Sequence, residues 1–540
     1  MVTARQFQKV LLLNPPGKCH LREDGSLGER KHCVPPLGLA YIAANLLKHE
    51  FDVEVLDILA EGYDQQRFDD PFITYGLTIE QTLERVRNAQ PDVIGISVLF
   101  SNRAKESLEI AEALKREFPE VKIVLGGQHP SGLPLEMMKR PQIDFVLVGE
   151  ADTSMVQLLY GLNGHGPLEE VPGLYYRKDG EVATTTSRDK AVVAGEGWNY
   201  FYLKDFPSPK LDDLAYPAWH LFPMDKYWHS EVRVGGGDIM RERFAVMMST
   251  RGCPHTCEFC TSPLLSGYKG YRMRTNEDVV KEIHWLIDRF GIQEIMFLDD
   301  NFFVSKPRVK RLLKVLAEEF PSTVFSVPAG TEVNALDFET IDLCAKANFH
   351  KLTLAIEAGD QSVQQARVDK NVKLDRLPEI VAHIRKAGLR TQGLFMIGFP
   401  DETREQINRT IDLALSVDVD DFYISICTPL PGTPLYDECV RRGLLYEDFD
   451  VNNLRYSVAN IKLPDTSRED LEDIRRNVWL RFRHNQTSKT EYAIIKRPYR
   501  EFRTTDDYEY AGFQQRPKLL RSGGDETPTT HEKVPEGVSP

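Results

Sequence analysis

The sequence predicts an α/β protein in which a doubly wound parallel sheet is followed by a second strand–helix array that closes partly into a barrel. Three observations predict this class. Short runs rich in Val, Ile and Leu alternate with helical patterns in both halves of the 540-residue chain. A stretch rich in proline and aromatic residues separates the halves. Three closely spaced cysteines follow the first strand of the second half.

The first half contains five apolar runs that we interpret as strands buried on both faces. Four helical patterns separate them, as the βα units of a doubly wound sheet require. The predicted strands cover residues 9–13, 53–57, 93–97, 122–125 and 145–148, and the predicted helices cover 37–49, 78–88, 104–118 and 153–162.

Small, polar and turn-forming residues follow these predicted strands. Ligands of doubly wound sheets bind at the carboxyl ends of the strands, where such residues gather. We therefore predict a ligand site there, built from Asn14, Pro15, Pro16, Ser97, Ser101, Gly126, Gly127, His129, Gly149 and Glu150.

The second half contains six predicted strands, at residues 244–249, 294–298, 324–327, 351–356, 391–397 and 422–427. Five helices between them, at 276–290, 307–320, 337–347, 376–387 and 404–416, complete a partial (β/α)6 barrel. The predicted domains are a sheet domain at 1–165, a linker with a hairpin at 166–240, the barrel at 241–440, a helical extension at 441–490 and a disordered tail at 500–540.

Composition narrows the class of protein. The chain has 67 Lys and Arg against 81 Asp and Glu, a net charge of −14, so neither nucleic acid nor an anionic membrane is an expected partner. No signal peptide and no apolar run of about 18 residues is present. Eight cysteines are too few for a secreted disulfide scaffold, which favours a cytoplasmic protein.

The cysteines Cys253, Cys257 and Cys260 have the spacing C-x3-C-x2-C. Three thiolates in one tight loop can each hold an iron of a [4Fe–4S] cluster, leaving the fourth iron open to a ligand. A structural zinc ion is the alternative, but it normally needs four protein ligands. His255 is the only nearby fourth candidate, and it is poorly placed between two of the cysteines.

This loop resembles the motif of the radical S-adenosylmethionine (SAM) superfamily. The resemblance implies that the open iron binds SAM and that reductive cleavage of SAM gives a 5′-deoxyadenosyl radical. It also implies that Phe259 lies near the adenine of SAM. Residues after later barrel strands match the family's SAM contacts in order: Asp299, Asp300, Glu357 and Gly398.

The N-terminal sheet before such a barrel resembles the cobalamin-dependent branch of this superfamily. The glycines at its strand ends would let the backbone approach a bulky corrin. The Asp-x-His-x-x-Gly pattern that supplies an axial histidine is absent, and lining a loop or capping a helix is the simpler role for His129. A dinucleotide is the alternative ligand, although no Gly-x-Gly-x-x-Gly follows the first strand.

The resemblance extends to methyltransferases of the fosfomycin and phosphinothricin pathways. It implies transfer of a methyl group from SAM, by way of methylcobalamin, to an unactivated carbon or a P–H phosphorus of a small molecule. A flavodoxin- or ferredoxin-like protein would supply electrons. The alternatives are a cobalamin-binding radical cyclase or other radical oxidoreductase and, outside catalysis, an iron–sulfur or zinc protein.

Two further groups of residues are candidates for the junction between the halves. Arg251, Lys269, Arg272 and Arg274 flank the cysteine loop and could bind a phosphonate, with solvated surface charge as the alternative. Trp219 and Tyr227 could line a cofactor interface, although packing is the more common role for such residues.

Overall fold

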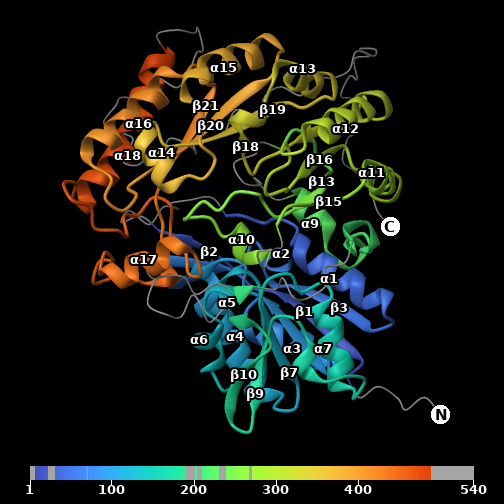
Figure 1. The fold of residues 1–540 in the computed structure, drawn as a ribbon. Coiled ribbons are helices and arrows are strands. Elements are labelled where there is room, and N and C mark those ends of the chain that lie inside the picture. Colours follow the sequence, from blue (N-terminus) through green and yellow to red (C-terminus); the bar gives the residue numbers. More distant parts are fainter. Residues whose placement is uncertain are drawn as a thin grey trace, which may run out of the picture.

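The computed structural model describes residues 7–21, 31–69, 71–188, 201–202, 210–229, 239–266 and 270–487. The predicted tail at 500–540, Lys269 and much of the predicted linker lie outside these residues. Two α/β halves are stacked on each other, with the N-terminal half, blue to teal, below the yellow-to-orange barrel in Figure 1.

The N-terminal half is built on one seven-stranded sheet in the order β10-β9-β8-β7-β6-β1-β3. Strands β3, β1, β6, β7 and β8 are parallel to one another, and all five were predicted. The predicted hairpin forms, and β9 pairs antiparallel with β8, so the hairpin extends this sheet. The strand bounds are β1 Lys9–Asn14, β3 Asp52–Asp57, β6 Val93–Ser97, β7 Lys122–Gly126, β8 Phe145–Leu147, β9 Leu174–Lys178 and β10 Glu181–Thr184.

Helices cover both faces of this sheet because its side chains alternate between two apolar layers. Val10 and Leu12 of β1 pack in the layer that contains α1 and α7. Leu11 and Leu13 pack in the layer that contains α3 and α4. The helices are α1 Leu37–Lys48, α2 Ile58–Glu61, α3 Ile79–Ala89, α4 Ala104–Glu117, α5 Gln128–Gly132, α6 Pro134–Met138 and α7 Ser154–Leu162.

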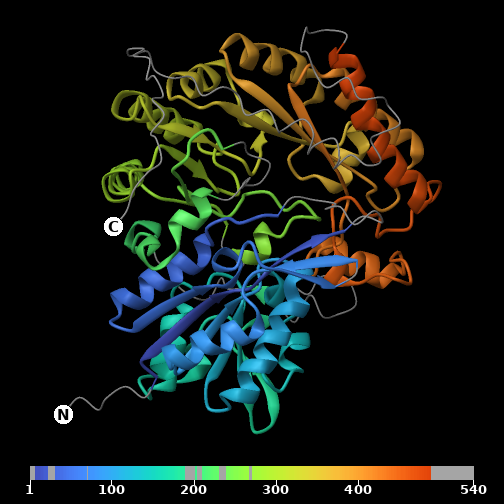
Figure 2. The ribbon, with the colours of Figure 1, turned by 180° about the vertical axis from the view of Figure 1, so that it is seen from behind.

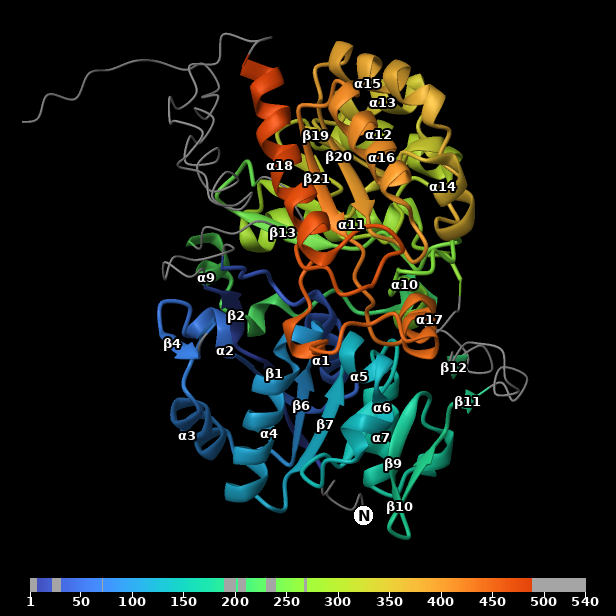
Figure 3. The same cartoon turned by 90° about the vertical axis from the view of Figure 1, so that its left-hand side faces the viewer.

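A small antiparallel sheet, which the sequence did not predict, follows the end of β1. It has the order β2-β5-β4 and consists of β2 Gly17–His20, β5 Phe72–Tyr75 and β4 Gln66–Asp69. The blue strands β2 and β4 stand at one edge of the lower half in Figure 3. This sheet extends the protein beyond the carboxyl end of β1.

The barrel is partial. Strands β13, β16 and β17 form one parallel sheet, and β18, β19, β20 and β21 form another. A single bridge between Phe325 and Phe349 joins them. Within the described residues β13 does not pair with β21, so the barrel stays open on that side. The strands are β13 Phe244–Met247, β16 Glu294–Phe297, β17 Val324–Ser326, β18 Thr331–Glu332, β19 Lys351–Glu357, β20 Arg390–Ile397 and β21 Asp421–Ile426.

Helices surround the barrel and continue into a C-terminal extension. Helix α18 packs on α16 and β21 and runs along the outside of the barrel, red in Figure 2. Helices α10 (Ser262–Leu265) and α17 lie between the two halves (Figure 3). The other helices are α11 Asn276–Phe290, α12 Lys306–Glu319, α13 Phe338–Lys346, α14 Gln361–Arg367, α15 Leu377–Lys386, α16 Arg404–Ser416, α17 Pro434–Arg442 and α18 Arg468–Thr487.

The described part of the linker packs into the core. Trp219, in the 3-10 turn η4 (Trp219–Leu221), and Tyr227, in α9 (Met224–His229), are fully buried. Among the described helices, none combines the length and apolar character that crossing a bilayer requires. The division of the chain into domains at the predicted boundaries stays a prediction.

Candidate functional site

The cysteine loop begins directly after β13, and a buried carboxylate holds its entrance. Asp299, fully buried after β16, accepts hydrogen bonds from Ser249 N at 3.0 Å, Ser249 Oγ at 2.7 Å and Thr250 Oγ1 at 2.5 Å. Burial raises the pKa of Asp299, and these donors oppose that shift. The side chain therefore braces the loop.

The neighbouring carboxylate of Asp300 joins the two ends of the loop. It accepts hydrogen bonds from Gly252 N, at 2.9 Å, and from the hydroxyl of Ser262. These residues flank the three cysteines on either side. Gly252 has a φ of +78°, and a Cβ there would lie 2.3 Å from the carbonyl oxygen of Gly270. Only glycine suits this position.

Burial raises the pKa of all three cysteine thiols, to about 12 for Cys257. Two donors approach the sulfurs: Asn301 Nδ2 lies 3.8 Å from Cys253 Sγ, and Ser262 N lies 3.4 Å from Cys260 Sγ. Bound iron would hold such thiols as thiolates. Within the described residues no three His, Cys, Asp or Glu could share one metal ion. A cluster needs only one thiolate per iron.

His255, the candidate fourth zinc ligand, has protein partners on both ring nitrogens. Nε2 lies 2.9 Å from Glu332 Oε2, and Nδ1 lies 3.0 Å from the carbonyl oxygen of Asp369. The Asp369 carboxylate also accepts a hydrogen bond from Thr256 N at 2.9 Å. The histidine therefore fastens the cysteine loop to later barrel loops, which disfavours the zinc alternative.

Glu357, at the end of β19, has a strained backbone and a charged partner. Its φ is +66°, a backbone angle that residues other than glycine and asparagine rarely adopt. Such backbone strain is concentrated at functional sites. Lys370 Nζ lies 2.7 Å from Glu357 Oε1. Burial opposes the charge of Lys370, but Glu357 and Cys257 together raise its pKa. Sequence reasoning missed Lys370, which no motif marks.

The loop after β20 contacts the cysteine loop through aromatic rings. The rings of Phe259 and Phe399 meet edge to face with centroids 5.8 Å apart. Gly398 has a φ of +86°, and Gly398 N and Phe399 N donate to Glu402 Oε2 at 2.5 and 3.0 Å. Burial raises the pKa of Glu402 to about 7. Sequence reasoning missed this carboxyl group as well.

At the carboxyl edge of the N-terminal sheet some buried polar atoms have no partner within the described residues, as is also true of Asn301 Oδ1 and Arg272 Nε beside the cysteine loop. Ser101 Oγ and His129 Nδ1 make no hydrogen bond within the described residues. Burial lowers the pKa of His129 to about 4, so the ring is neutral. Gly127 has a φ of +106°, and a Cβ there would lie 2.7 Å from Val98 O.

The remaining predicted residues of this edge are more tightly held. Asn14 Nδ2 lies 3.0 Å from both oxygens of Asp57, which also accepts a hydrogen bond from Tyr227 at 2.5 Å. Tyr227 thus secures the linker helix to the sheet. Pro15 and Pro16 are buried, Ser97 and Gly126 pair across β6 and β7, and Gly149 N donates to Ser131 Oγ at 3.0 Å.

Arginines that flank the cysteine loop join the two halves. Arg251 binds Asp152 through both guanidinium nitrogens, at 2.5 and 3.1 Å, and lies 3.5 Å from Glu150. Arg272 also pairs with Glu150, and Arg274 pairs with carboxylates of α11. These three arginines therefore form internal ion pairs and are not solvated surface charges, whereas phosphonate binding by them stays a prediction. Glu150 acts at the junction through its carboxylate.

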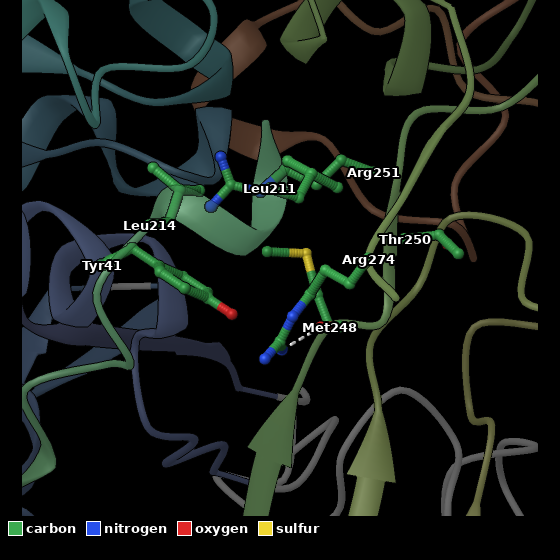
Figure 4. A pocket seen from close by; sticks show the side chains of 7 residues that line it. All are labelled: Tyr41, Leu211, Leu214, Met248, Thr250, Arg251 and Arg274. Atoms are coloured by element: carbon green, nitrogen blue, oxygen red, sulfur yellow. Dashed lines mark hydrogen bonds between the residues drawn. The ribbon is translucent and has the colours of Figure 1, made fainter. Parts of the chain in front are cut away.

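A small pocket lies beside Arg251 and Arg274 (Figure 4). Tyr41 comes from the N-terminal half and points toward Met248 and Arg274 of the barrel half. The whole lining consists of Tyr41, Leu211, Leu214, Met248, Thr250, Arg251 and Arg274. This pocket is far too small for a small-molecule ligand, so it belongs to the packing of the junction.

The residues present fit a large ligand with a polar rim at the N-terminal edge. Leu99 and Phe100, directly after β6, are about half exposed, which is unusual for large apolar side chains beside a packed junction. Ser101, next in the chain, has an unsatisfied buried hydroxyl. The 3-10 turn η1 (Ser101–Arg103) faces η7 (Val451–Asn453) of the C-terminal extension. A corrin offers both apolar faces and polar side chains to such a surface.

Comparisons with known proteins agree with this geometry. Residues 25–159 match the B12 binding domain, and residues 247–414 match the radical SAM superfamily. The cytidylyl-2-hydroxyethylphosphonate methyltransferase of Streptomyces wedmorensis is 30% identical over 482 residues, which cover 85% of this chain and 87% of that protein.

Two solved structures have a similar fold. The radical SAM methyltransferase TsrM from Kitasatospora setae, with cobalamin and a [4Fe–4S] cluster bound, covers 81% of this chain and 78% of its own at a TM-score of 0.60 and 18% identity. The cobalamin-dependent radical enzyme OxsB, with aqua-cobalamin bound, covers 94% of this chain and 71% of its own at a TM-score of 0.62 and 17% identity.

The predicted fold, the nature of the enzyme and its cofactors are thereby confirmed, whereas the cofactor contacts of individual residues stay predictions. The protein uses a [4Fe–4S] cluster, SAM and cobalamin. The chain belongs to the cobalamin-dependent radical SAM methyltransferases.

Proposed function

We propose that this enzyme methylates an unactivated carbon of a phosphonate intermediate in natural-product biosynthesis. The observation that carries this proposal is the 30% identity with the cytidylyl-2-hydroxyethylphosphonate methyltransferase across most of both chains. A P–H phosphorus of a phosphinate is the second acceptor that the sequence resemblance implies.

The chain's own residues support this chemistry by position. Cys253, Cys257 and Cys260 would hold the cluster, and Glu357 and Gly398 would contact SAM after β19 and β20. Bound cobalamin would carry the methyl group, and SAM bound at the cluster would supply the radical that removes a hydrogen from the substrate. The loop after barrel strand β13 meets the loop after β8 of the N-terminal sheet where Arg251 binds Asp152. This arrangement would bring the two cofactors together.

In this proposal Arg251 and Arg274 do not bind the phosphonate, because both already have carboxylate partners. Arg272 pairs with Glu150 through Nη2, and its Nε and Nη1 have no partner within the described residues. We place the substrate instead at the carboxyl ends of the barrel strands, between the sites proposed for SAM and cobalamin. A flavodoxin- or ferredoxin-like electron donor and a cytoplasmic location complete the proposal.

The test is a product assay under anaerobic conditions. Enzyme reconstituted with cluster and cobalamin is given a strong reductant and SAM that carries a deuterated methyl group. Cytidylyl-hydroxyethylphosphonate and N-acetyl-demethylphosphinothricin are the candidate substrates. We expect mass spectrometry to find the labelled methyl group in the first compound.

Other outcomes would change the proposal in defined ways. Label in the second compound alone would name phosphorus as the acceptor. Deoxyadenosine without labelled product would contradict the phosphonate class while leaving the radical chemistry in place. A product that has lost hydrogens and gained no methyl group would favour an oxidative cyclase.

A further inference from the structure

We propose that a buried group of oxygen acceptors at the carboxyl edge of the N-terminal sheet binds the amide side chains of the corrin. We name this group the acceptor cluster. It consists of Thr74 from β5, Ser101 and Asn102 from η1, and Glu106 from α4. The inference rests on the use of cobalamin by this family, and not on the identity of the methylated substrate.

The acceptor cluster is unsatisfied within the described residues. Thr74 Oγ1, Ser101 Oγ, Asn102 Oδ1 and Glu106 Oε2 are buried and make no hydrogen bond, and Glu106 Oε1 has only its ion pair with Lys18. The side chain of Glu106 is only 2% exposed. Leaving several such atoms without donors is costly, so each native instance calls for a ligand or an ordered water.

The ammonium group of Lys18 lies beside these oxygens. Lys18 Nζ is 3.0 Å from Glu106 Oε1, and the side chain of Lys18 is 5% exposed. The same ammonium lies 4.3 Å from the centroid of the Phe72 ring. Lys18 pairs with Thr74 across β2 and β5, which brings both to the same face of the small sheet. The charge of Glu106 is thus balanced, and the surplus of acceptors remains.

The position of the acceptor cluster is the one where doubly wound sheets bind ligands. Strand β1 lies between β3 and β6, so the order of strands reverses at this point. Lys18 follows the carboxyl end of β1, and Ser101 follows that of β6. Strand β2, which follows β1, contacts η1, which follows β6. The acceptor cluster therefore lies at the topological switch point.

The chemistry of the acceptor cluster favours a neutral donor, because Asn102 Oδ1 and the Glu106 carboxylate only accept hydrogen bonds, while the hydroxyls of Thr74 and Ser101 can accept or donate. An anionic group would meet the carboxylate of Glu106, and a cation would compete with Lys18. A primary amide is neutral and offers two N–H donors, and the corrin of cobalamin carries such amides around its rim. The acceptor cluster would therefore distinguish an amidated corrin from one whose side chains are carboxylates.

The test measures corrin binding by the full-length protein, with equilibrium dialysis and absorbance as readouts. The two probes are cobinamide, which keeps the amide side chains, and cobyrinic acid, whose side chains are carboxylates. The main variant combines Lys18→Met with Glu106→Leu, because replacing both members of a buried ion pair with apolar residues often preserves stability. Thermal unfolding checks that the variant is folded.

We expect wild-type protein to bind cobinamide at least about 10-fold more tightly than the double variant does, as loss of hydrogen bonds to a charged acceptor predicts. The preference for cobinamide over cobyrinic acid should also fall by at least about 10-fold, because the repelling carboxylate is gone. Glu112→Gln, at an exposed ion pair on the same helix, is the matched control and should bind as wild type does.

Unchanged affinity and unchanged preference in a folded double variant would overturn the proposal and assign the acceptor cluster to ordered water. If that variant does not fold, Ser101→Ala decides: weaker cobinamide binding supports the proposal, and unchanged binding contradicts it. Because neither probe undergoes methyl transfer, failure of the proposed substrate assay would leave this result untouched.

Discussion

The cysteine loop and the carboxyl edge of the N-terminal sheet satisfy their buried polar atoms in different ways. In the loop, Asp299 and Asp300 receive donors from the residues on both sides of the cysteines. At the edge of the sheet, Ser101, His129 and Glu106 are buried with unpartnered atoms. The comparison teaches that the protein's own carboxylates brace the cysteine loop, whereas the sheet edge offers buried polar atoms to a ligand. Atoms without partners within the described residues, such as Asn301 Oδ1 and Arg272 Nε, also occur beside the loop.

A group of ion pairs also holds the cysteine loop in place. Arg367, at the end of α14, lies 2.8 Å from Glu258 inside the cysteine loop and 2.6 Å from Glu438 of α17. Arg442 also pairs with Glu438, at 2.6 Å. The C-terminal extension is thereby linked to the loop between its second and third cysteines. The loop is held from several elements that are distant in sequence.

The largest expected effect is the loss of one cofactor site while the other is retained. Cys257→Ala should abolish the cluster and the formation of deoxyadenosine, because one iron loses its ligand. Cobalamin binding should persist, because the N-terminal edge is untouched. Iron content, deoxyadenosine yield and cobalamin absorbance provide the measurements. Cys344→Ala, at a buried cysteine of α13, is the control and should retain the cluster. Retained SAM cleavage in Cys257→Ala would refute the assignment.

The next effect concerns the ion pairs that join the regions. Arg251→Met leaves Asp152 and Glu150 partly unpaired in a buried setting, which should lower the free energy of unfolding by about 3–5 kcal/mol. Chemical denaturation measures this loss. Arg116→Met, at an exposed pair of α4, should cost at most about 1 kcal/mol. Equal losses in both variants would show that the junction is not the stabilising contact that its geometry indicates.

The pH dependence of stability tests the burial of His129 at the carboxyl edge of the N-terminal sheet. The folded pKa of His129 is about 4, below its ordinary value of 6.5. Its contribution to stability is complete above pH 6.5 and is lost as the pH falls through 4, at a total of about 3 kcal/mol. His129→Phe should therefore weaken the acid sensitivity of cobalamin-free protein in this window, as thermal unfolding can show. His220→Phe, at an exposed histidine, should not; an unaltered profile in His129→Phe contradicts the burial.

The barrel should respond to pH with the opposite sign. Burial raises the pKa of Glu402 from 4.5 to about 7. The protonated form is favoured in the folded state, so stability is complete below pH 4.5 and falls by about 3 kcal/mol as the pH rises through 7. Glu402→Gln should flatten that decline in a thermal unfolding series. Glu405→Gln, exposed on α16, should leave it unchanged, and a persistent decline in Glu402→Gln would contradict the account.

The sequence predicted the regular elements well where local signals are strong. Helix α11 has the predicted bounds because Thr275 caps its start and Gly291, with a φ of +64°, ends it. Helix α16 also has its predicted bounds, with a capping box formed by Thr403 and Gln406. The sheet of β2, β5 and β4 was missed because β2 (GKCH) and β4 (QRFD) are largely polar and lack the apolar run by which the other strands were predicted.

The site was harder to predict, because the roles of charged residues depend on partners distant in sequence. The cysteine spacing identified the cluster loop, but nothing local indicated that Arg251 would bind Asp152, 99 residues away. Lys370 and Glu402 belong to no motif that the sequence reasoning used. The acceptor cluster likewise joins residues from β5, η1 and α4, which only the folded chain brings together with Lys18 of β2.

Hydrogen exchange with and without cobalamin tests most directly whether the protein shapes one site and the ligand completes the other. Full-length enzyme is labelled before and after addition of hydroxocobalamin, and peptides are analysed by mass spectrometry. We predict new protection at residues 98–107 and 127–132, and little change at 249–252, which Asp299 and Asp300 already hold. Protection confined to the cysteine loop, with residues 98–107 and 127–132 unchanged, would contradict the account.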